Sequence, residues 1–255
     1  MPESLPPIAI RVENLGIEFR RYRAQSLSIK SSVLNLFKGT QFQQFWALRN
    51  VSLSVRRGEV LGIVGRNGAG KSTLLRAIAG ILPPAEGRVS FNGVLAPLME
   101  LGGGFNGELT GRENIFLNGA IMGLSKSKVA SRVDAIVEFA ELGDFIDSPL
   151  STYSTGMKAR LAFAVGTDID PDILLVDEVF AVGDERFKRK AQERIEKFFR
   201  AGKTIIMVSH SLELLKKYST RVLYLERGEL VSEGPPASVI EHYLNATVNS
   251  PAAQA

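Results

Sequence analysis

The sequence contains no cysteine and only two histidines, His210 and His242. A chain without thiols forms no disulfide, offers no thiolate to a metal and has no cysteine nucleophile. Two histidines also argue against a zinc site built from several imidazoles. Any chemistry must therefore come from hydroxyl, carboxylate, amine and backbone groups.

Long hydrophobic runs are also lacking. No apolar segment approaches the roughly 18–20 residues that a membrane-spanning helix needs. Residues 1–15 lack both the basic region and the continuous apolar core of a signal peptide. We expect a soluble cytoplasmic protein, so that any membrane-spanning part of its system would belong to another protein.

Neither sign of charge dominates. Lysine and arginine number 31 and aspartate and glutamate 27, which leaves a net charge of +4. This small excess permits an anionic partner such as a nucleotide, a nucleic acid or a membrane surface, but it selects none of them. With 255 residues, of which 45% are hydrophobic, the chain can bury a large core in one large domain or two small ones.

What is present is an alternation of short apolar runs with longer amphipathic stretches. The pattern predicts strands at 8–15, 47–55, 59–64, 173–176 and 204–208, and helices at 71–79, 114–122, 126–142, 157–167 and 187–199. Alternating strands and helices predict an α/β fold with a largely parallel central sheet. Residues 105–165 are expected to form a helical lobe, and residues 1–7 and 246–255 loose tails.

A glycine-rich segment follows the third predicted strand and leads into a predicted helix. Its residues are Gly65, Arg66, Asn67, Gly68, Ala69, Gly70, Lys71, Ser72 and Thr73, which fit the pattern G-x-x-x-x-G-K-[ST] in full. The glycines let the backbone wrap so that successive N–H groups point at phosphate oxygens, and the helix end adds partial positive charge. We expect Lys71 to reach the β- and γ-phosphates and Ser72 to bind Mg²⁺.

Two acids follow the apolar strand at 173–176, namely Asp177 and Glu178. In a fold with a phosphate loop, Asp177 would hold the metal and Glu178 would orient or activate the attacking water. A second acid favours hydrolysis over phosphoryl transfer to an acceptor. The structural alternative is that the pair ends a strand and caps the next turn.

The segment 153–160 reads Tyr-Ser-Thr-Gly-Met-Lys-Ala-Arg and precedes a predicted helix. Alone, its serine would be an ordinary helix N-cap. In order after the phosphate loop and before the Asp-Glu strand, the segment makes the chain resemble the ATP-binding subunits of ABC transporters. The usual family signature is Leu-Ser-Gly-Gly-Gln, and the variant here is similar to that of the branch that exports surface polysaccharides.

This resemblance implies roles for further residues. Ser154, Thr155, Gly156 and Met157 would contact the ATP held by a second copy of the chain, as would Asp184 in the segment Ala-Val-Gly-Asp. His210 would hydrogen-bond the γ-phosphate and hold Glu178 or the water in place, and Lys71 and Glu178 complete the catalytic set. We expect His242 to be structural.

Two positions depart from the family pattern. The loop that usually carries a glutamine has none here. Glu100 or Leu101 is nearest to its position, Glu100 is the candidate for its metal-sensing role, and three glycines follow at 102–104. The aromatic residue that stacks on adenine is Phe19 by strand register. An insertion at about 20–45 follows it, so that Tyr22, Phe45 and Trp46 remain alternatives.

The insertion begins with basic residues and continues with an apolar stripe. Arginines stand at 20, 21 and 23, and Ile29, Val33, Leu36 and Phe37 are spaced as on one face of a short helix. This helix packs on its own domain, or it lies at the membrane surface beside a lipid-linked substrate.

The resemblance covers about residues 8–241, and we predict one ABC-type nucleotide-binding domain over 8–245. It implies a RecA-like P-loop NTPase core with a helical subdomain, ATP and Mg²⁺ as cofactors, and an ATP-sandwich homodimer. The dimer would drive a separate permease at the cytoplasmic face of the inner membrane. The cargo would be a lipid-linked polysaccharide, contacted mainly through the permease.

Other functions remain as alternatives. The chain could serve another ABC importer or a drug exporter. A nucleic-acid-associated ABC ATPase and a small-molecule kinase fit fewer of the motifs, and we expect no nucleic-acid partner. Because only a short tail follows residue 241, we expect no additional carbohydrate-binding domain.

Overall fold

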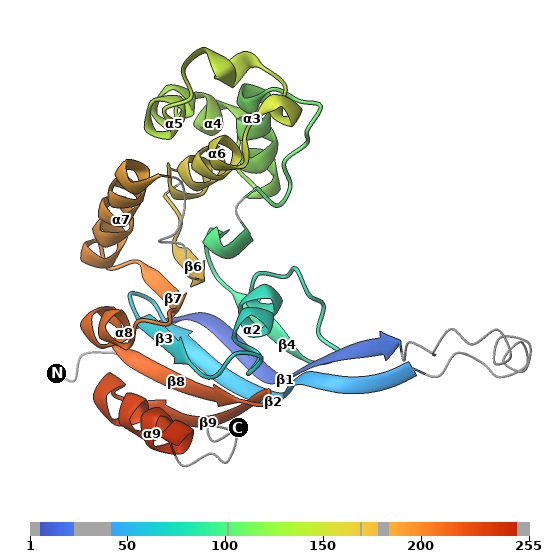
Figure 1. Cartoon of the computed structure of the whole chain (residues 1–255), viewed down its shortest axis with the longest axis vertical. Helices are drawn as coiled ribbons and strands as arrows, with labels where there is room; N and C mark the ends of the chain where they lie inside the picture. The colour runs from blue at the N-terminus through green and yellow to red at the C-terminus, as the bar shows by residue number, and fades with distance from the viewer. Residues whose placement is uncertain (1–5, 23–41, 101, 169, 178–183, 249–255) are drawn as a thin grey trace, which may run out of the picture.

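Two β-sheets organise the fold (Figure 1). The computed structural model describes residues 6–22, 42–100, 102–168, 170–177 and 184–248, with the side chains at 20–22, 42–43 and 100 left aside. The larger sheet has the order β5 (Leu95–Pro97), β6 (Ile173–Asp177), β7 (Thr204–Val208), β3 (Val60–Val64), β8 (Arg221–Glu226) and β9 (Glu229–Gly234). Its neighbours pair in parallel, except for the antiparallel pair β8–β9.

The smaller sheet is antiparallel. Its order is β2 (Phe42–Arg56), β1 (Ile8–Tyr22) and β4 (Glu86–Phe91). The first two strands are longer than the sequence pattern predicts: β1 runs on to Tyr22 and β2 starts at Phe42. Residues 20–22 and 42–45, which we expected in an insertion, therefore form the arms of a long hairpin. The predicted amphipathic helix between these arms lies outside the described residues.

The central strands are apolar throughout because both faces of the larger sheet are covered. In β6, Ile173 and Leu175 join a core with β1, β2 and α2 (Lys71–Ile78). The alternate residues Leu174 and Val176 join a second core that reaches the lobe and the C-terminal helices. One face of the larger sheet thus packs against α2, the helix that starts at the phosphate loop. The other face packs against the helical lobe and the C-terminal helices.

Helices of the chain's middle third stand apart from the sheets, as Figure 1 shows. They are α3 (Gly111–Ile121), α4 (Lys126–Ala130), α5 (Val133–Ala140) and α6 (Thr155–Asp168), with short 3-10 turns at Leu98–Glu100, Gly143–Asp147 and Leu150–Thr152. A capping box starts α3: Thr110 accepts from the Glu113 backbone, and Glu113 accepts from the Thr110 backbone.

The helix predicted over 126–142 is in fact two helices. The first ends at Ala130, where the hydroxyl of Ser131 donates to the carbonyl of Lys128 at 2.8 Å. A serine side chain that bonds the backbone in this way competes with the helical hydrogen bonds. The apolar periodicity continues across the break, which is why the sequence pattern did not show it.

Three further helices pack beside the larger sheet: α7 (Glu185–Arg200), α8 (Leu212–Tyr218) and α9 (Pro236–Val248). Neither predicted tail is wholly loose. Residues 246–248 belong to α9. At the other end, the carbonyl of Pro7 accepts a hydrogen bond from the Arg57 backbone at 2.9 Å.

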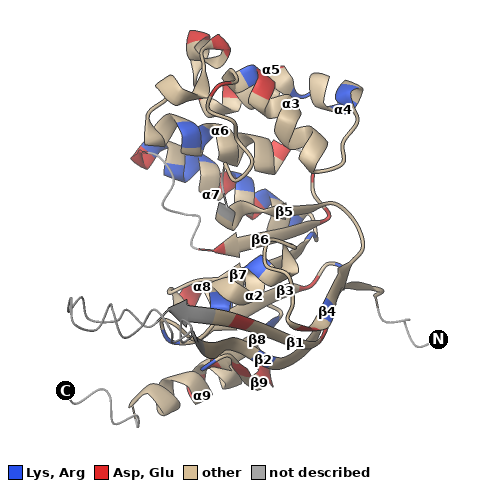
Figure 2. Cartoon of the chain, turned by 90° about the vertical axis from the view of Figure 1, so that its right-hand side faces the viewer, with Lys and Arg blue, Asp and Glu red and all other residues tan. Residues whose placement is uncertain are grey.

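Positions of both charge signs are spread along the described chain, and several basic positions lie on α6 and α7 (Figure 2). No helix in the described ranges has the length and apolar character needed to cross a bilayer.

Candidate nucleotide-binding site

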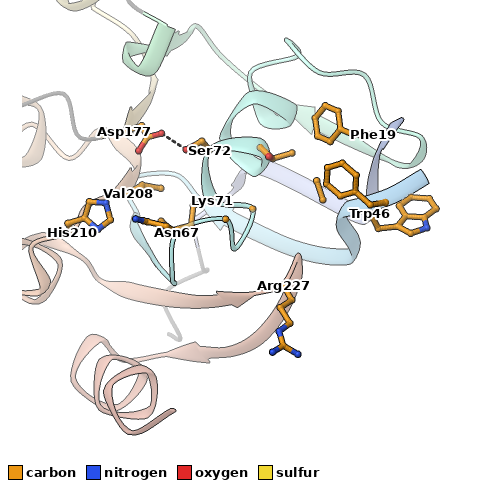
Figure 3. Close-up of a pocket in the computed structure, with 14 residues that line it drawn as sticks. Phe19, Trp46, Asn67, Lys71, Ser72, Asp177, Val208, His210 and Arg227 are labelled. Atoms are coloured by element: carbon orange, nitrogen blue, oxygen red, sulfur yellow. Dashed lines mark hydrogen bonds between the residues drawn. The ribbon is translucent and has the colours of Figure 1, made fainter. Parts of the chain in front are cut away.

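A pocket of about 600 Å³ opens at the carboxyl ends of the parallel strands (Figure 3). Side chains from distant parts of the sequence line it: Phe19, Phe45, Trp46, Ala47, Asn67, Gly68, Gly70, Lys71, Ser72, Thr73, Asp177, Val208, His210 and Arg227. Loops at this edge of a parallel sheet are the usual place for a ligand, because the strands all point their functional ends there.

The phosphate loop joins β3 to α2. Gly70 stands immediately before α2 with φ 104, and no side chain caps the helix, so its first N–H groups remain available to a ligand. A Cβ atom at Gly70 would lie 2.8 Å from the carbonyl oxygen of Ala47. Only glycine therefore satisfies both the backbone angle and the close approach of β2. The arrangement forms an anion site for phosphate groups.

Lys71 is buried and folds back over the phosphate loop. Its ammonium group donates to the carbonyl of Gly65 at 2.7 Å and to that of Arg66 at 3.1 Å. These bonds hold the positive charge at the centre of the cradle. The expected position of Lys71 beside the phosphates is consistent with this geometry.

Ser72 and Asp177 meet although they are 105 residues apart. The Ser72 hydroxyl donates to Asp177 Oδ2 at 2.8 Å, and Figure 3 marks this bond. A hydroxyl and a carboxylate beside a phosphate cradle are oxygen ligands of the type that Mg²⁺ takes, with waters and phosphate oxygens filling its other positions. The donor set fits Mg²⁺. Within the described ranges no larger metal cluster of three or more acidic or histidine side chains occurs.

Two predicted residues cannot be placed. Glu178 directly follows Asp177 but lies outside the described residues. Glu100 ends the 3-10 turn after β5, and its side chain is also outside the description. The roles expected for Glu178 and Glu100 remain predictions.

His210 follows β7 and lines the same pocket as Lys71 and Asp177. Figure 3 shows its ring on the side of the pocket where Asp177 lies. The parallel pairing of β6 with β7 explains this proximity, since Asp177 is opposite Val208 in the register. His242, in contrast, packs away from the pocket: its Nδ1 is 3.0 Å from the Ser232 hydroxyl and its ring meets Tyr224 edge-on.

Three of the four aromatic candidates reach the pocket. Phe19 and Phe45 lie opposite each other on β1 and β2, and their rings stack with centroids 5.7 Å apart. They are 37% and 48% exposed, so both offer a ring face to a ligand. Trp46 lines the pocket too, whereas the side chain of Tyr22 is outside the description. We call Phe19, Phe45 and Trp46 together the aromatic wall; which of them stacks on adenine stays a prediction.

The predicted trans-acting residues lie outside the pocket of their own chain. Ser154 precedes α6, and its hydroxyl accepts a hydrogen bond from the Met157 backbone at 3.2 Å. Thr155, Gly156 and Met157 form the first turn of α6. Asp184 caps α7 by accepting from the Phe187 backbone at 2.9 Å. Within one chain, these residues form helix N-termini and none of them lines the pocket.

Buried Tyr153 anchors the start of this segment. Its hydroxyl donates to the carbonyl of Phe145, and burial raises its pKa, which keeps the hydroxyl protonated as a donor. Tyr153 therefore fixes the position from which Ser154 is presented.

Arg227 is the charged pocket residue that the sequence analysis missed, and Ala47 and Val208 line the pocket without having been predicted either. Arg227 stands in the two-residue turn between β8 and β9, and neither of these strands was predicted. The available signal is Gly228 soon after the apolar run at 222–225, although hairpin turns usually place asparagine or aspartate before such a glycine.

Comparisons with known proteins agree with this geometry. A family model described as ABC transporter matches residues 48–181. The O-antigen export system ATP-binding protein RfbB of Myxococcus xanthus is 41% identical over 96% of this chain and 57% of its own length. A protein of the same name from Klebsiella pneumoniae is 41% identical over 93% of this chain and 98% of its own length.

A third relative is the teichoic acids export ATP-binding protein TagH of Lactococcus lactis, which is 41% identical over 92% of this chain and 50% of its own length. The chain thus spans little more than half of the Myxococcus relative and half of the Lactococcus relative.

Solved structures share the fold at lower identity. The ATP-binding subunit of an ABC transporter has a TM-score of 0.69 at 22% identity, over 92% of this chain and 93% of that one. A dimeric ATP-binding cassette bound to ADP and Pi has a TM-score of 0.66 at 22% identity, over 89% and 98%. The α/β fold with a mostly parallel sheet, expected from the sequence, is confirmed.

Proposed function

This chain belongs to the ABC transporter family, and we propose that it is the ATP-hydrolysing subunit of a transporter that exports a lipid-linked polysaccharide. The observation that carries the ATP site is the 2.8 Å contact between Ser72 and Asp177 beside the phosphate loop. The cargo is argued from relatives named for O-antigen and teichoic acid export, each 41% identical over more than nine-tenths of the chain.

Binding would begin at the phosphate loop. Backbone N–H groups around Gly70 and the start of α2 would donate hydrogen bonds to the phosphate oxygens, and Lys71 would exchange its carbonyl partners for those oxygens. Ser72 and Asp177 would hold Mg²⁺, which neutralises phosphate charge when bound. The aromatic wall would take the adenine.

Hydrolysis would depend on two side chains at the ends of neighbouring strands. We assign Glu178, next to Asp177, the task of orienting the attacking water, and His210 that of hydrogen-bonding the γ-phosphate. Both act by position and charge, because phosphoryl transfer needs little covalent participation from the protein.

A second copy of the chain would complete the site. Ser154 and Asp184 stand at the N-termini of α6 and α7. Neither residue lines the nucleotide pocket of its own chain. In our proposal they contact the ATP that a second copy holds, so that ATP binding closes the dimer and hydrolysis opens it.

A permease would be the second partner. A groove of about 310 Å³ runs beside Gly102 and Gly103, and the side chains of Phe91 and Ile121 at its rim are exposed. Exposed apolar side chains around a groove mark a protein contact surface. We propose that the permease docks here and holds the chain at the cytoplasmic face of the inner membrane.

The replacement Glu178→Gln tests the hydrolytic proposal. We expect the purified variant to bind ATP like the parent chain and to form an ATP-dependent dimer. Its turnover should fall at least about a hundredfold, because the carboxylate that positions the water is gone. Phosphate release measures turnover, and sedimentation with and without ATP measures the ATP-dependent dimer. Full turnover by this variant would remove Glu178 from the mechanism.

A cellular assay tests the cargo. Cells that lack the chain should accumulate lipid-linked glycan inside and lose it from the surface, and the parent gene but not the Glu178→Gln gene should restore it. Normal surface glycan in the deletion strain would favour another ABC importer or exporter. Stimulation of the ATPase by DNA or ribosomes, rather than by permease in lipid, would favour the nucleic-acid-associated class.

A further inference from the structure

The turn between β8 and β9 carries an arginine where the backbone favours another residue. Arg227 and Gly228 form this turn with φ 49 and 82. Two-residue hairpin turns with both angles positive favour Asn-Gly or Asp-Gly, because short polar side chains tolerate the left-handed region. Backbone geometry alone therefore does not explain Arg227.

Hydrogen bonds fix this turn to the phosphate loop. The Gly228 N–H donates to the carbonyl of Ala69 at 3.0 Å, and the Gly228 carbonyl accepts from the Arg49 backbone at 2.9 Å. A Cβ atom at Gly228 would lie 2.5 Å from the carbonyl oxygen of Ala47, so β2 presses directly on the turn. The backbone of Arg227 is thus held in place between the phosphate cradle and the strand that bears Phe45 and Trp46.

The side chain of Arg227 is exposed at the pocket and, within the described residues, has no ion pair or side-chain hydrogen bond. Figure 3 shows the turn that bears Arg227 on the same half of the view as Trp46, with Lys71 between it and the pair Asp177 and His210, and the guanidinium points away from the pocket in this conformation. The γ-phosphate end of the pocket is where Ser72 and Asp177 meet. Arg227 therefore borders the opposite end, where the aromatic wall stands.

We propose that the exposed side chain of Arg227 turns over the pocket when ATP is bound, and that its guanidinium then binds the nucleoside part of ATP beside the aromatic wall. This inference rests on the proposed function, since it assigns a ligand contact within the same site. A planar guanidinium stacks on a flat base and donates hydrogen bonds to ribose hydroxyls. A cation placed here adds affinity for the nucleoside without contacting the reacting phosphate.

The replacement Arg227→Asn removes the guanidinium and keeps the backbone conformation of the turn, so that it tests the side chain alone. Asparagine suits a positive φ, so the turn should form as well as in the parent and the melting temperature should not fall. We expect the variant to bind ATP about five- to tenfold more weakly by titration calorimetry in EDTA, which corresponds to a single cation–π or charged hydrogen bond. Binding of inorganic tripolyphosphate should stay within about twofold of the parent chain, because its phosphates do not reach Arg227.

A matched control is Arg57→Asn. Arg57 precedes Gly58 in another exposed turn, outside the nucleotide pocket, and this replacement should leave binding of both ligands unchanged. Equal ATP affinity in the parent and in Arg227→Asn would overturn the proposal, and so would an equal loss for ATP and tripolyphosphate. A parent chain that binds no ATP would contradict the proposed function as well, so the two failures are distinguishable.

Discussion

At the scale of single residues, the site depends on an oxygen pair that no local pattern connects. The Ser72 hydroxyl and the Asp177 carboxylate come from α2 and β6 and meet at 2.8 Å. In our proposal these two oxygen groups hold the divalent cation beside the phosphate cradle.

We predict that Ser72→Ala weakens the dependence of ATP affinity on Mg²⁺. The variant should bind ATP in EDTA like the parent chain, but its apparent affinity for Mg²⁺ should fall at least about tenfold because one oxygen ligand is missing. Titration of a fluorescent ATP analogue with and without Mg²⁺ measures this. Ser90→Ala, at an exposed strand position, is the control. An unchanged Mg²⁺ effect would exclude Ser72 from the metal site.

The aromatic wall leads to a second prediction at this scale. Replacing both Phe19 and Phe45 by alanine should weaken ATP binding about tenfold or more, because base stacking on an aromatic ring contributes about 1–3 kcal/mol. Phe145, which is 56% exposed on the lobe, provides a control for the loss of an exposed ring. Calorimetry with ATP and with tripolyphosphate measures the effect, and unaltered ATP binding in the double variant would contradict the stacking role.

At the scale of elements, α7 holds the carboxyl ends of two lobe helices. The Lys190 ammonium donates to the Phe139 carbonyl at 3.0 Å and to Glu141 at 2.9 Å, both at the end of α5. Arg194 donates to Asp168 at the end of α6 at 3.0 Å. Cations at helix C-termini satisfy unpaired carbonyls and the helix dipole. These contacts fix the far end of the helix that begins next to Ser154.

We predict that Lys190→Met lowers the free energy of unfolding by about 1–2 kcal/mol, since it removes two hydrogen bonds from a partly buried ammonium. Urea denaturation measures this loss. Lys197→Met, on an exposed position of the same helix, should cost little. An equal effect of the two replacements would show that Lys190 contributes only helix propensity.

The Glu141 side chain adds a prediction about pH. The hydrogen bond from Lys190, followed by the nearby charges of Arg186 and Arg160, holds the pKa of Glu141 below its ordinary value. A carboxylate with a lowered pKa stabilises the fold above its unfolded pKa, near 4.3, and this contribution is lost as the pH falls through the folded value. Glu141→Gln should therefore be less stable than the parent chain at pH 7 and equally stable at low pH. A difference in unfolding midpoint that persists in acid would contradict this.

At the scale of the whole molecule, one chain holds only part of the proposed catalytic site. Ser154 lies at the start of α6, outside the pocket that contains Lys71. If a second copy completes the site, the pocket that contains Lys71 binds ATP and the surface that contains Ser154 closes the dimer. ATP binding and dimer closure are then separate steps.

We predict that Ser154→Ala separates these steps. The variant should bind ATP as the parent chain does at low protein concentration, but ATP should no longer induce a dimer in analytical ultracentrifugation. Ser125→Ala is a matched control, because Ser125 also caps a lobe helix by accepting from a backbone N–H. Each change should cost about 1 kcal/mol of helix capping. Dimer formation by Ser154→Ala would place the serine outside the interface.

Patterns contiguous in the sequence predicted much of the fold. The phosphate loop, the buried strands β6 and β7 and the start of α2 follow from residues that are neighbours along the chain. The strands β4, β5 and β9 escaped prediction because they are short or at sheet edges, where half-buried residues blur the alternation. The interior strand β8 is a short apolar run that the sequence analysis did not identify as a strand. The break between α4 and α5 escaped because the apolar periodicity continues across it.

The amino-acid order by itself determined the phosphate cradle, because glycine angles and helix N–H groups act within a few residues of one another. It also determined that the central sheet is buried on both faces. Only the tertiary structure decided which distant groups meet: Ser72 with Asp177, Phe19 with Phe45, and Arg227 with the pocket. Strand order and register place these groups, and both depend on the packing of the whole core, which no short stretch of sequence encodes.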